Sequence, residues 1–194
     1  IESIEEEGFY GLKSLIELNM NNNWIKAIKK GLFYGLESLK IFRLNTNQIH
    51  SIEVDGFYGL GNLTELNLGF NKIKTIKKGS FFSMKSLLKL QFTINFIELV
   101  DEEMFNGLSN LNEIEFSANS LKIIKNRSFS VLIKLEKLIL KTNLIEFIEE
   151  DGFFNLKNLN YLDLSSNNIK IIEKKSFSYL NSLTKLDLGS NYVD

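Results

Sequence analysis

The sequence repeats itself every 24 residues, and this period constrains the fold more than any other feature. Counting from Leu15 as offset one, leucine returns at offset one of eight successive units, the last of which begins at Leu183. Offsets four and six are also apolar in every unit, as at Leu66 and Leu68. This alternation predicts a short, half-buried strand around offsets four to six. A fixed period of about 20–29 residues is typical of a solenoid, in which such strands stack side by side as a parallel sheet.

Asparagine occupies offset nine in all eight units: Asn23, Asn47, Asn71, Asn95, Asn119, Asn143, Asn167 and Asn191. After each strand the chain has to turn inward, which leaves buried backbone N–H and C=O groups that need partners. An amide side chain both donates and accepts hydrogen bonds. We therefore expect a column of asparagines that bonds to the turns of its own unit and of the neighbouring unit.

Phenylalanine occupies offset nineteen without exception: Phe9, Phe33, Phe57, Phe81, Phe105, Phe129, Phe153 and Phe177. An aliphatic residue always stands at offset fourteen, and leucine or methionine at offset twenty-two. Stacked over successive units, these side chains predict an aromatic spine behind the sheet.

The consensus LxxLxLxxNxIxxIxxxxFxxLxx resembles the 24-residue leucine-rich repeat of animal extracellular proteins, which include Toll-like receptors, chaoptin-like adhesion proteins and Slit-like guidance proteins. The resemblance covers the whole chain. It implies an α/β-type solenoid, a curved horseshoe with a parallel concave β-sheet and an irregular or short-helical convex side. It also implies an extracellular or cell-surface location, with a role in innate immune recognition or in cell adhesion.

The whole chain, residues 1–194, is expected to form a single repeat array. Seven full repeats run from Leu15 to Ser182, and residues 1–14 and 183–194 are partial repeats. The family often has proline near offset sixteen and cysteine-rich caps, but this chain contains no proline and no cysteine. We expect either a stretch of a longer array or ends that meet other chains.

The charges nearly cancel, with 23 Lys and Arg against 24 Asp and Glu. At offsets fifteen to seventeen, acidic units such as Glu5–Glu7 alternate with basic units such as Lys29–Lys30. Each acidic turn is therefore expected to lie between two basic turns, as a solvated ladder that prevents a continuous basic stripe. On this ground we expect no nucleic-acid partner. No apolar run approaches the ~20 residues of a membrane span, so we expect no membrane insertion by this segment.

Catalytic chemistry is not visible in the sequence. The single histidine, His50, stands at offset twelve and is expected to be an exposed flank residue, and neither a zinc-ligand spacing nor a phosphate-binding loop occurs. We expect no enzyme, no cofactor and no metal. Glycines recur at offset twenty-one, where a tight convex turn is the favoured interpretation. The sequons at Asn62 and Asn126 are glycosylation candidates on the convex or flank surface.

Exposed apolar residues at offsets that are usually polar are the candidates for contact with a partner. Phe70 and Ile94 share offset eight in adjacent units, and Phe96 follows at offset ten, so we expect a ridge at the edge of the concave face. The alternative is a scatter of surface apolar residues. The complete set of partner-binding candidates is Trp24, Ile41, Arg43, Phe70, Ile94, Phe96, Ile139 and Tyr161.

Two further stripes run along the array. Offset thirteen is apolar over four consecutive units and is a candidate surface for self-association: Leu99, Ile123, Phe147 and Ile171. Offset twenty is aromatic on the convex side at Tyr10, Tyr34, Tyr58 and Phe82. The alternative for either stripe is an outer packing layer.

The hypothesis that follows from these features is a non-enzymatic recognition module. It would bind a protein or another macromolecule through its concave face or flank, and a homo-oligomer is possible. The alternative is a structural subunit of a self-associating assembly, which the partial end repeats and the alternating charges favour.

Overall fold

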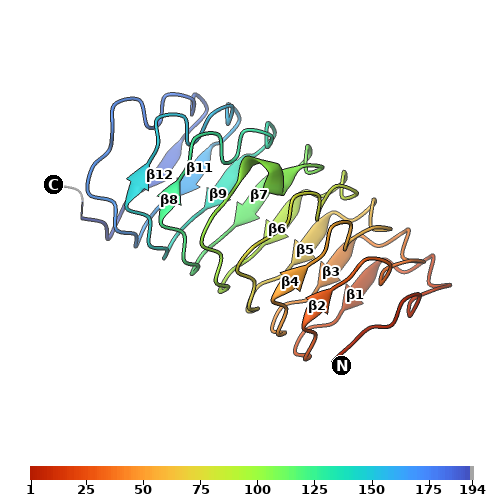
Figure 1. The fold of residues 1–194 in the computed structure, drawn as a ribbon. Coiled ribbons are helices and arrows are strands. Elements are labelled where there is room, and N and C mark those ends of the chain that lie inside the picture. Colours follow the sequence, from red (N-terminus) through yellow and green to blue (C-terminus); the bar gives the residue numbers. More distant parts are fainter. Residues whose placement is uncertain (193–194) are drawn as a thin grey trace.

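A single parallel sheet runs the length of the molecule (Figure 1). The computed structural model describes residues 1–192. Eight strands pair in chain order, one from each repeat: β1 (Glu17–Asn19), β3 (Ile41–Arg43), β5 (Glu65–Asn67), β6 (Lys89–Gln91), β7 (Glu113–Glu115), β9 (Lys137–Ile139), β11 (Tyr161–Asp163) and β12 (Lys185–Asp187). Each residue pairs with the residue 24 positions later, as Leu66 does with Leu90. The predicted solenoid is confirmed, although the strands occupy offsets three to five and begin one residue before the predicted strand.

The rest of each repeat is largely irregular. Two-residue strands at offsets thirteen and fourteen form two further pairs, β2 (Ala27–Ile28) with β4 (Ser51–Ile52) and β8 (Ile123–Ile124) with β10 (Phe147–Ile148). Within residues 1–192, the only helical segment is the 3-10 turn η1 (Glu102–Phe105). No helix in this described part of the chain is long and apolar enough to cross a membrane. The irregular convex side is thus confirmed.

The asparagine column lies inside the turns that follow the strands. Asn119 Nδ2 donates to the Phe116 carbonyl of its own repeat at 3.0 Å and to the Phe92 carbonyl of the preceding repeat at 2.9 Å. Its Oδ1 accepts the backbone N–H of Ile97 at 3.0 Å. The same three bonds recur at Asn47, Asn71, Asn95, Asn143 and Asn167, all of which are buried. Each asparagine therefore links two turns, as predicted.

The offset-nineteen phenylalanines form the predicted spine, with one detour. Neighbouring rings stack with centroids 5.6–6.4 Å apart in both halves of the array, from Phe9 to Phe81 and from Phe105 to Phe177. Between Phe81 and Phe105 the stack passes through two rings from the sheet side. Phe92 and Phe116 stack on one another at 5.2 Å, and each meets its spine neighbour edge-on at 6.2 Å. The 3-10 turn η1 ends at Phe105, so the detour coincides with this helical turn.

The alternating charges link neighbouring repeats on the convex side. Lys30 pairs with Asp55 at 3.3 Å and Lys175 with Glu150 at 3.4 Å. Lys78 pairs with Glu103 in the same way. Exposed pairs contribute only about 0–1 kcal/mol each, so their main effect is to disfavour a slip by one repeat, which would bring like charges together.

Replacing Phe105 by alanine should lower the free energy of unfolding by about 3–5 kcal/mol, because it removes a fully buried ring from the spine. Chemical denaturation measures the change. Phe82→Ala is the matched control, since Phe82 stands at the next offset and is 59% exposed. A loss below about 1 kcal/mol for Phe105→Ala would contradict its place in the core.

Replacing Asn119 by alanine should cost about 2–4 kcal/mol, because two buried carbonyls and one buried N–H lose a partner. Asn191 makes the same bonds in the half-buried last turn. Asn191→Ala should therefore cost less than half as much in the same denaturation experiment. Equal losses at the two positions would show that burial does not set the strength of the column.

Candidate partner-binding surface

The chain leaves every strand through a left-handed residue at offset eight. The φ angle there is 53–57° in all eight repeats. Most repeats place a small or polar residue at this point: Asn22, Thr46, Ala118, Thr142, Ser166 and Ser190. Phe70 and Ile94 are the exceptions, with φ of 54° and 55°. A left-handed backbone costs roughly 1–2 kcal/mol for an ordinary residue and is unusual for bulky and β-branched side chains. Two adjacent repeats therefore hold large apolar side chains in a strained conformation.

Three of the predicted partner-binding residues come together here and form a surface that we call the exit-edge ridge: Phe70, Ile94 and Phe96. The backbone N–H of Asn71 donates to the Ile94 carbonyl at 3.2 Å, so the two left-handed turns lie side by side. Phe70, Ile94 and Phe96 are 51%, 44% and 49% exposed. The ridge thus presents two aromatic rings and one aliphatic side chain to solvent on consecutive repeats.

The other candidates lie elsewhere on the array. Trp24 is exposed at offset ten, but one repeat with Thr46 and Gln48 at the equivalent offsets separates it from Phe70. Ile139 on β9 and Tyr161 on β11 are half-buried on neighbouring strands. Ile41 and Arg43 are half-buried on β3, which β5, β6 and β7 separate from β9 and β11. The structure therefore divides the predicted set into separate groups.

Tyr161 has an environment that sequence reasoning missed. Its ring lies between Lys137 Nζ at 5.8 Å and Lys185 Nζ at 4.8 Å. Its hydroxyl donates to Asp163, which also accepts bonds from Ser165 N and Oγ. Burial raises the pKa of the Tyr161 hydroxyl, and the Asp163 carboxylate raises it further. Tyr161 therefore stays a neutral hydrogen-bond donor near neutral pH.

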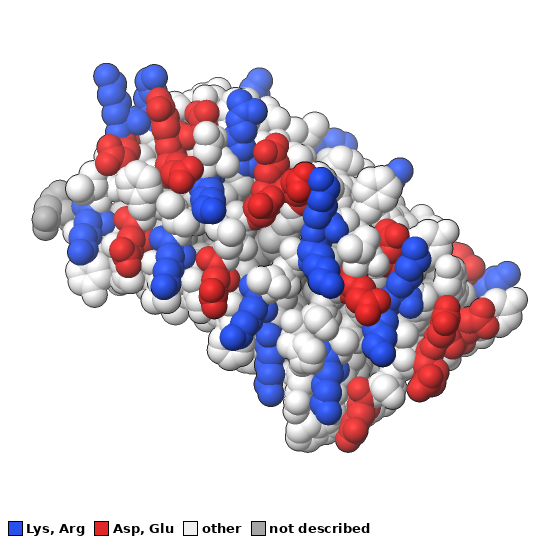
Figure 2. Space-filling model, viewed as in Figure 1, with Lys and Arg blue, Asp and Glu red and all other residues white. Residues whose placement is uncertain are grey.

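The concave face carries charges of both signs. Glu113 lies between Lys137 at 3.1 Å and Lys89 at 3.5 Å, on three successive strands. Arg43 pairs with Glu17 on the neighbouring strand. Figure 2 shows Lys and Arg interspersed with Asp and Glu over the visible face, without a broad field of one sign. The surface next to the exit-edge ridge is thus mixed in charge rather than basic or acidic.

Both of the other stripes are mostly open to solvent. On the flank, Leu99, Phe147 and Ile171 are exposed and Ile123 is half-buried; the four residues are called the flank stripe below. Phe147 on β10 pairs in register with Ile123 on β8. The convex aromatic residues are exposed as well: Tyr10, Tyr34, Tyr58 and Phe82. Neither stripe is a buried packing layer.

The remaining singled-out residues lie on the surface or in turns. His50, Asn62 and Asn126 are exposed, and Asn62 Nδ2 donates to the Glu37 carbonyl at 2.8 Å. At offset twenty-one, Gly107 has a φ of 103°, and an added Cβ would lie 2.6 Å from the Phe81 carbonyl oxygen. This close approach explains the glycine through turn geometry. Among residues 1–192, no group of three or more His, Cys, Asp or Glu side chains is arranged to hold a metal ion.

The repeat geometry is that of the leucine-rich repeat, and the sequence matches the family directly. The family profile described as "Leucine rich repeat" matches residues 1–49, 38–93, 87–145 and 133–193. The chain therefore belongs to the leucine-rich repeat family. None of the curated proteins compared with the chain is a significant match.

Solved structures of leucine-rich repeat proteins, two of them Toll-like, are similar to the chain. TLR13 in complex with ssRNA13 has a TM-score of 0.94 and 28% identity, over 98% of this chain and 27% of that chain. A leucine-rich repeat protein of Leptospira interrogans has a TM-score of 0.79 and 30% identity, over 94% and 45% of the two chains. Drosophila Toll in the Toll–Spatzle complex has a TM-score of 0.77 and 20% identity, over 98% and 29%. The chain thus spans less than half of each of these proteins.

These comparisons confirm the resemblance to Toll-like repeats and support a protein-interaction module in general. The leucine-rich repeat is typically a recognition fold without enzymatic activity. The expectation of no nucleic-acid partner gains no support, because the TLR13 structure is a complex with ssRNA13.

Replacing Phe70 by asparagine should leave the free energy of unfolding unchanged or raise it by up to about 1 kcal/mol. Asparagine tolerates the left-handed backbone better than phenylalanine, and Phe70 is half exposed. Urea denaturation measures the change, and Thr142→Asn is the control at the same offset. A loss of more than about 1 kcal/mol would mean that the Phe70 ring packs as core and is not held for contact with a partner.

Proposed function

We propose that the chain is a non-enzymatic recognition module that binds a protein partner through the exit-edge ridge and the adjoining concave face. The observation that carries this proposal is the pair of left-handed, exposed apolar residues Phe70 and Ile94. Backbone strain persists where the surrounding structure enforces it, and it concentrates at functional sites. Aromatic side chains, phenylalanine among them, are also enriched at the centres of protein interfaces.

A protein partner suits the surface better than a nucleic acid. Nucleic-acid binding depends on Lys and Arg that neutralise phosphates. Here the net charge is −1, and the concave lysines Lys89 and Lys137 share the carboxylate of Glu113. An apolar ridge beside a mixed-charge face matches the apolar centre and polar rim of a protein interface.

The setting that we infer is extracellular or at the cell surface, in innate immune recognition or cell adhesion. The similarity to Toll-like proteins supports this inference. The exposed sequons at Asn62 and Asn126 agree with a secreted glycoprotein. A self-associating structural subunit is the second candidate, and the exposed flank stripe is the observation that favours it.

Replacing Phe70 and Phe96 by serine should lower the recovery of cross-linked protein partners from native extracellular material by at least tenfold, since two aromatic anchors are worth about 1.4 kcal/mol or more. Quantitative mass spectrometry after cross-linking to the immobilised chain measures recovery. The Tyr10→Ser, Tyr58→Ser variant is the matched control, because it removes two exposed aromatic rings from the convex side.

The control variant should retain the same partners. Equal recovery with the ridge variant would exclude the ridge as the binding surface. Recovery of RNA rather than protein, sensitive to ribonuclease, would replace the protein partner with a nucleic acid.

A further inference from the structure

A row of alternating charges lies beside the flank stripe at offset twelve. The four repeats of the stripe carry there, in order, Glu98, Lys122, Glu146 and Lys170. All four are exposed, and within residues 1–192 none forms an ion pair in its own chain. The convex charges differ, because several of them pair with the next repeat. The offset-twelve charges are therefore available to a partner.

We propose that this flank binds a second copy of the chain around a two-fold axis that passes between the repeats of Ile123 and Phe147. A two-fold axis that crosses the solenoid at right angles brings like flanks together and reverses the order of repeats in the partner. Reversal of a row with an even number of alternating signs sets each charge against its opposite. Glu98 then faces the partner's Lys170, and Lys122 faces the partner's Glu146.

The same rotation brings the apolar residues of the two flank stripes face to face. Ile123 meets the partner's Phe147, and Leu99 meets the partner's Ile171. Phe147 borders a hollow of about 400 Å³ that Glu150 and Lys174 also line, which gives the surface relief for a partner side chain. At offset fifteen the central residues match too, because Lys125 faces the partner's Glu149. The outer residues there, Asp101 and the partner's Glu173, are alike in charge, so the contact is strongest at its centre.

The alternation also fixes the register of the contact. If the axis passed through the repeat of Phe147, Lys122 would face the partner's Lys170, and Glu146 would face the partner's Glu146. If it passed through the repeat of Ile123, Lys122 would face the partner's Lys122. Like charges in contact disfavour both arrangements. An axis between these two repeats is the arrangement that uses all four residues of the flank stripe.

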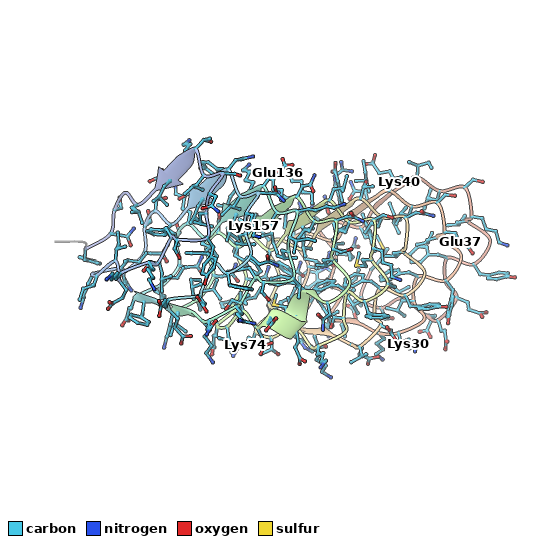
Figure 3. The ribbon with its side chains drawn as sticks, turned by 90° about the horizontal axis from the view of Figure 1, so that it is seen from above. Lys30, Glu37, Lys40, Lys74, Glu136 and Lys157 are labelled. Carbon is cyan, nitrogen blue, oxygen red and sulfur yellow. The ribbon has the colours of Figure 1, made fainter. Side chains whose placement is uncertain are left out.

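The first half of the same flank lacks large apolar side chains at offset thirteen. Offset thirteen carries there Ser3, Ala27, Ser51 and Thr75. Because large apolar residues stand at offset thirteen in only four successive repeats, the contact spans four repeats, or three steps of about 5 Å. In Figure 3, Lys30 and Lys74 lie along one long side of the array, opposite Lys40 and Glu136 on the sheet side. An interface of this size is small, so we expect a weak, concentration-dependent dimer. It does not depend on the proposed function of the exit-edge ridge, which lies at other offsets.

Charge exchange tests the pairing. Lys122→Glu should weaken dimerisation about tenfold, because the two-fold axis turns both central pairs into repulsive ones. The double variant Lys122→Glu, Glu146→Lys should restore the association to within about threefold of the original. Lys26→Glu, at the same offset in the first half of the flank, is the control and should have no effect. Sedimentation equilibrium up to millimolar concentration measures all four proteins, with circular dichroism to verify folding.

Disulfide trapping tests the geometry, because the chain has no cysteine of its own. Glu98→Cys mixed with Lys170→Cys should give an oxidised heterodimer, whereas either variant alone should not. Two copies of residue 98 would be three repeats apart, about 15 Å, which exceeds disulfide reach. Lys26→Cys mixed with Lys74→Cys is the control. The proteins in this experiment and in the sedimentation experiment, the original charge pattern included, carry Asn126→Gln, because a glycan on Asn126 would stand beside the centre of the contact.

A wild-type chain that stays monomeric at millimolar concentration would overturn the proposal. So would a double charge exchange that fails to restore association, or Glu98→Cys alone cross-linking as readily as the mixture. The Phe70→Ser, Phe96→Ser variant should dimerise normally. Loss of partner recovery with intact dimerisation, or the reverse, therefore separates failure of the exit-edge ridge from failure of this dimer.

Discussion

A hydrogen bond between the backbone of one turn and an asparagine side chain of the next is the interaction on which the rest of the structure depends. Asn119 accepts the N–H of Ile97 and donates to the carbonyls of Phe92 and Phe116, and its equivalents repeat these bonds along the array. The convex chain is mostly irregular and offers few backbone ladders of its own. The amide column therefore acts with the backbone bonds between turns, such as Lys72 N–H to the Ile49 carbonyl, and with the sheet to hold successive turns at one spacing, on which the stacking of the spine and the convex ion pairs depend.

The regular parts of the fold could be predicted because the residues that form them recur in eight repeats. Leucine at offset one, asparagine at offset nine and phenylalanine at offset nineteen are invariant, so one physical interpretation applies to every repeat. The detour of the spine through Phe92 and Phe116 could not be predicted in the same way. It depends on phenylalanine in place of the usual leucine at offset six of two adjacent repeats, and on the 3-10 turn η1 that ends at Phe105. The short strand pairs on the flank were missed as well, because a strand of two residues is too short to show the alternation of apolar and polar residues that identifies a strand.

The sequence identified which residues belong to the candidate surface, but it did not give their backbone conformation or their positions relative to one another. Phe70, Ile94 and Phe96 stand out in the sequence as apolar residues at polar offsets. Their left-handed backbone is not encoded in their own side chains, and the signal for it lies in the small and polar residues at offset eight of the other repeats. For Tyr161, the flanking lysines follow from the 24-residue register, which places Lys137 and Lys185 on the neighbouring strands. Residues on the concave face lie close together only when their strands are neighbours in the sheet. Ile41 on β3 and Ile139 on β9 are therefore far apart, because β5, β6 and β7 lie between their strands.

A solenoid can carry separate binding surfaces because each repeat contacts mainly its neighbours. The left-handed turn recurs in every repeat, but only Phe70 and Ile94 place a large apolar side chain on it, and the asparagine column and the spine continue through these two repeats. Charge alternates from repeat to repeat in two separate rows. On the convex side, adjacent turns carry opposite charges and form ion pairs such as Lys30 with Asp55. At offset twelve the alternating charges form no ion pair within the described residues 1–192. In the proposed dimer, two copies that run in opposite directions would bring the opposite charges of this second row together, so a period of two repeats can serve contacts within the chain in one row and contacts between chains in another.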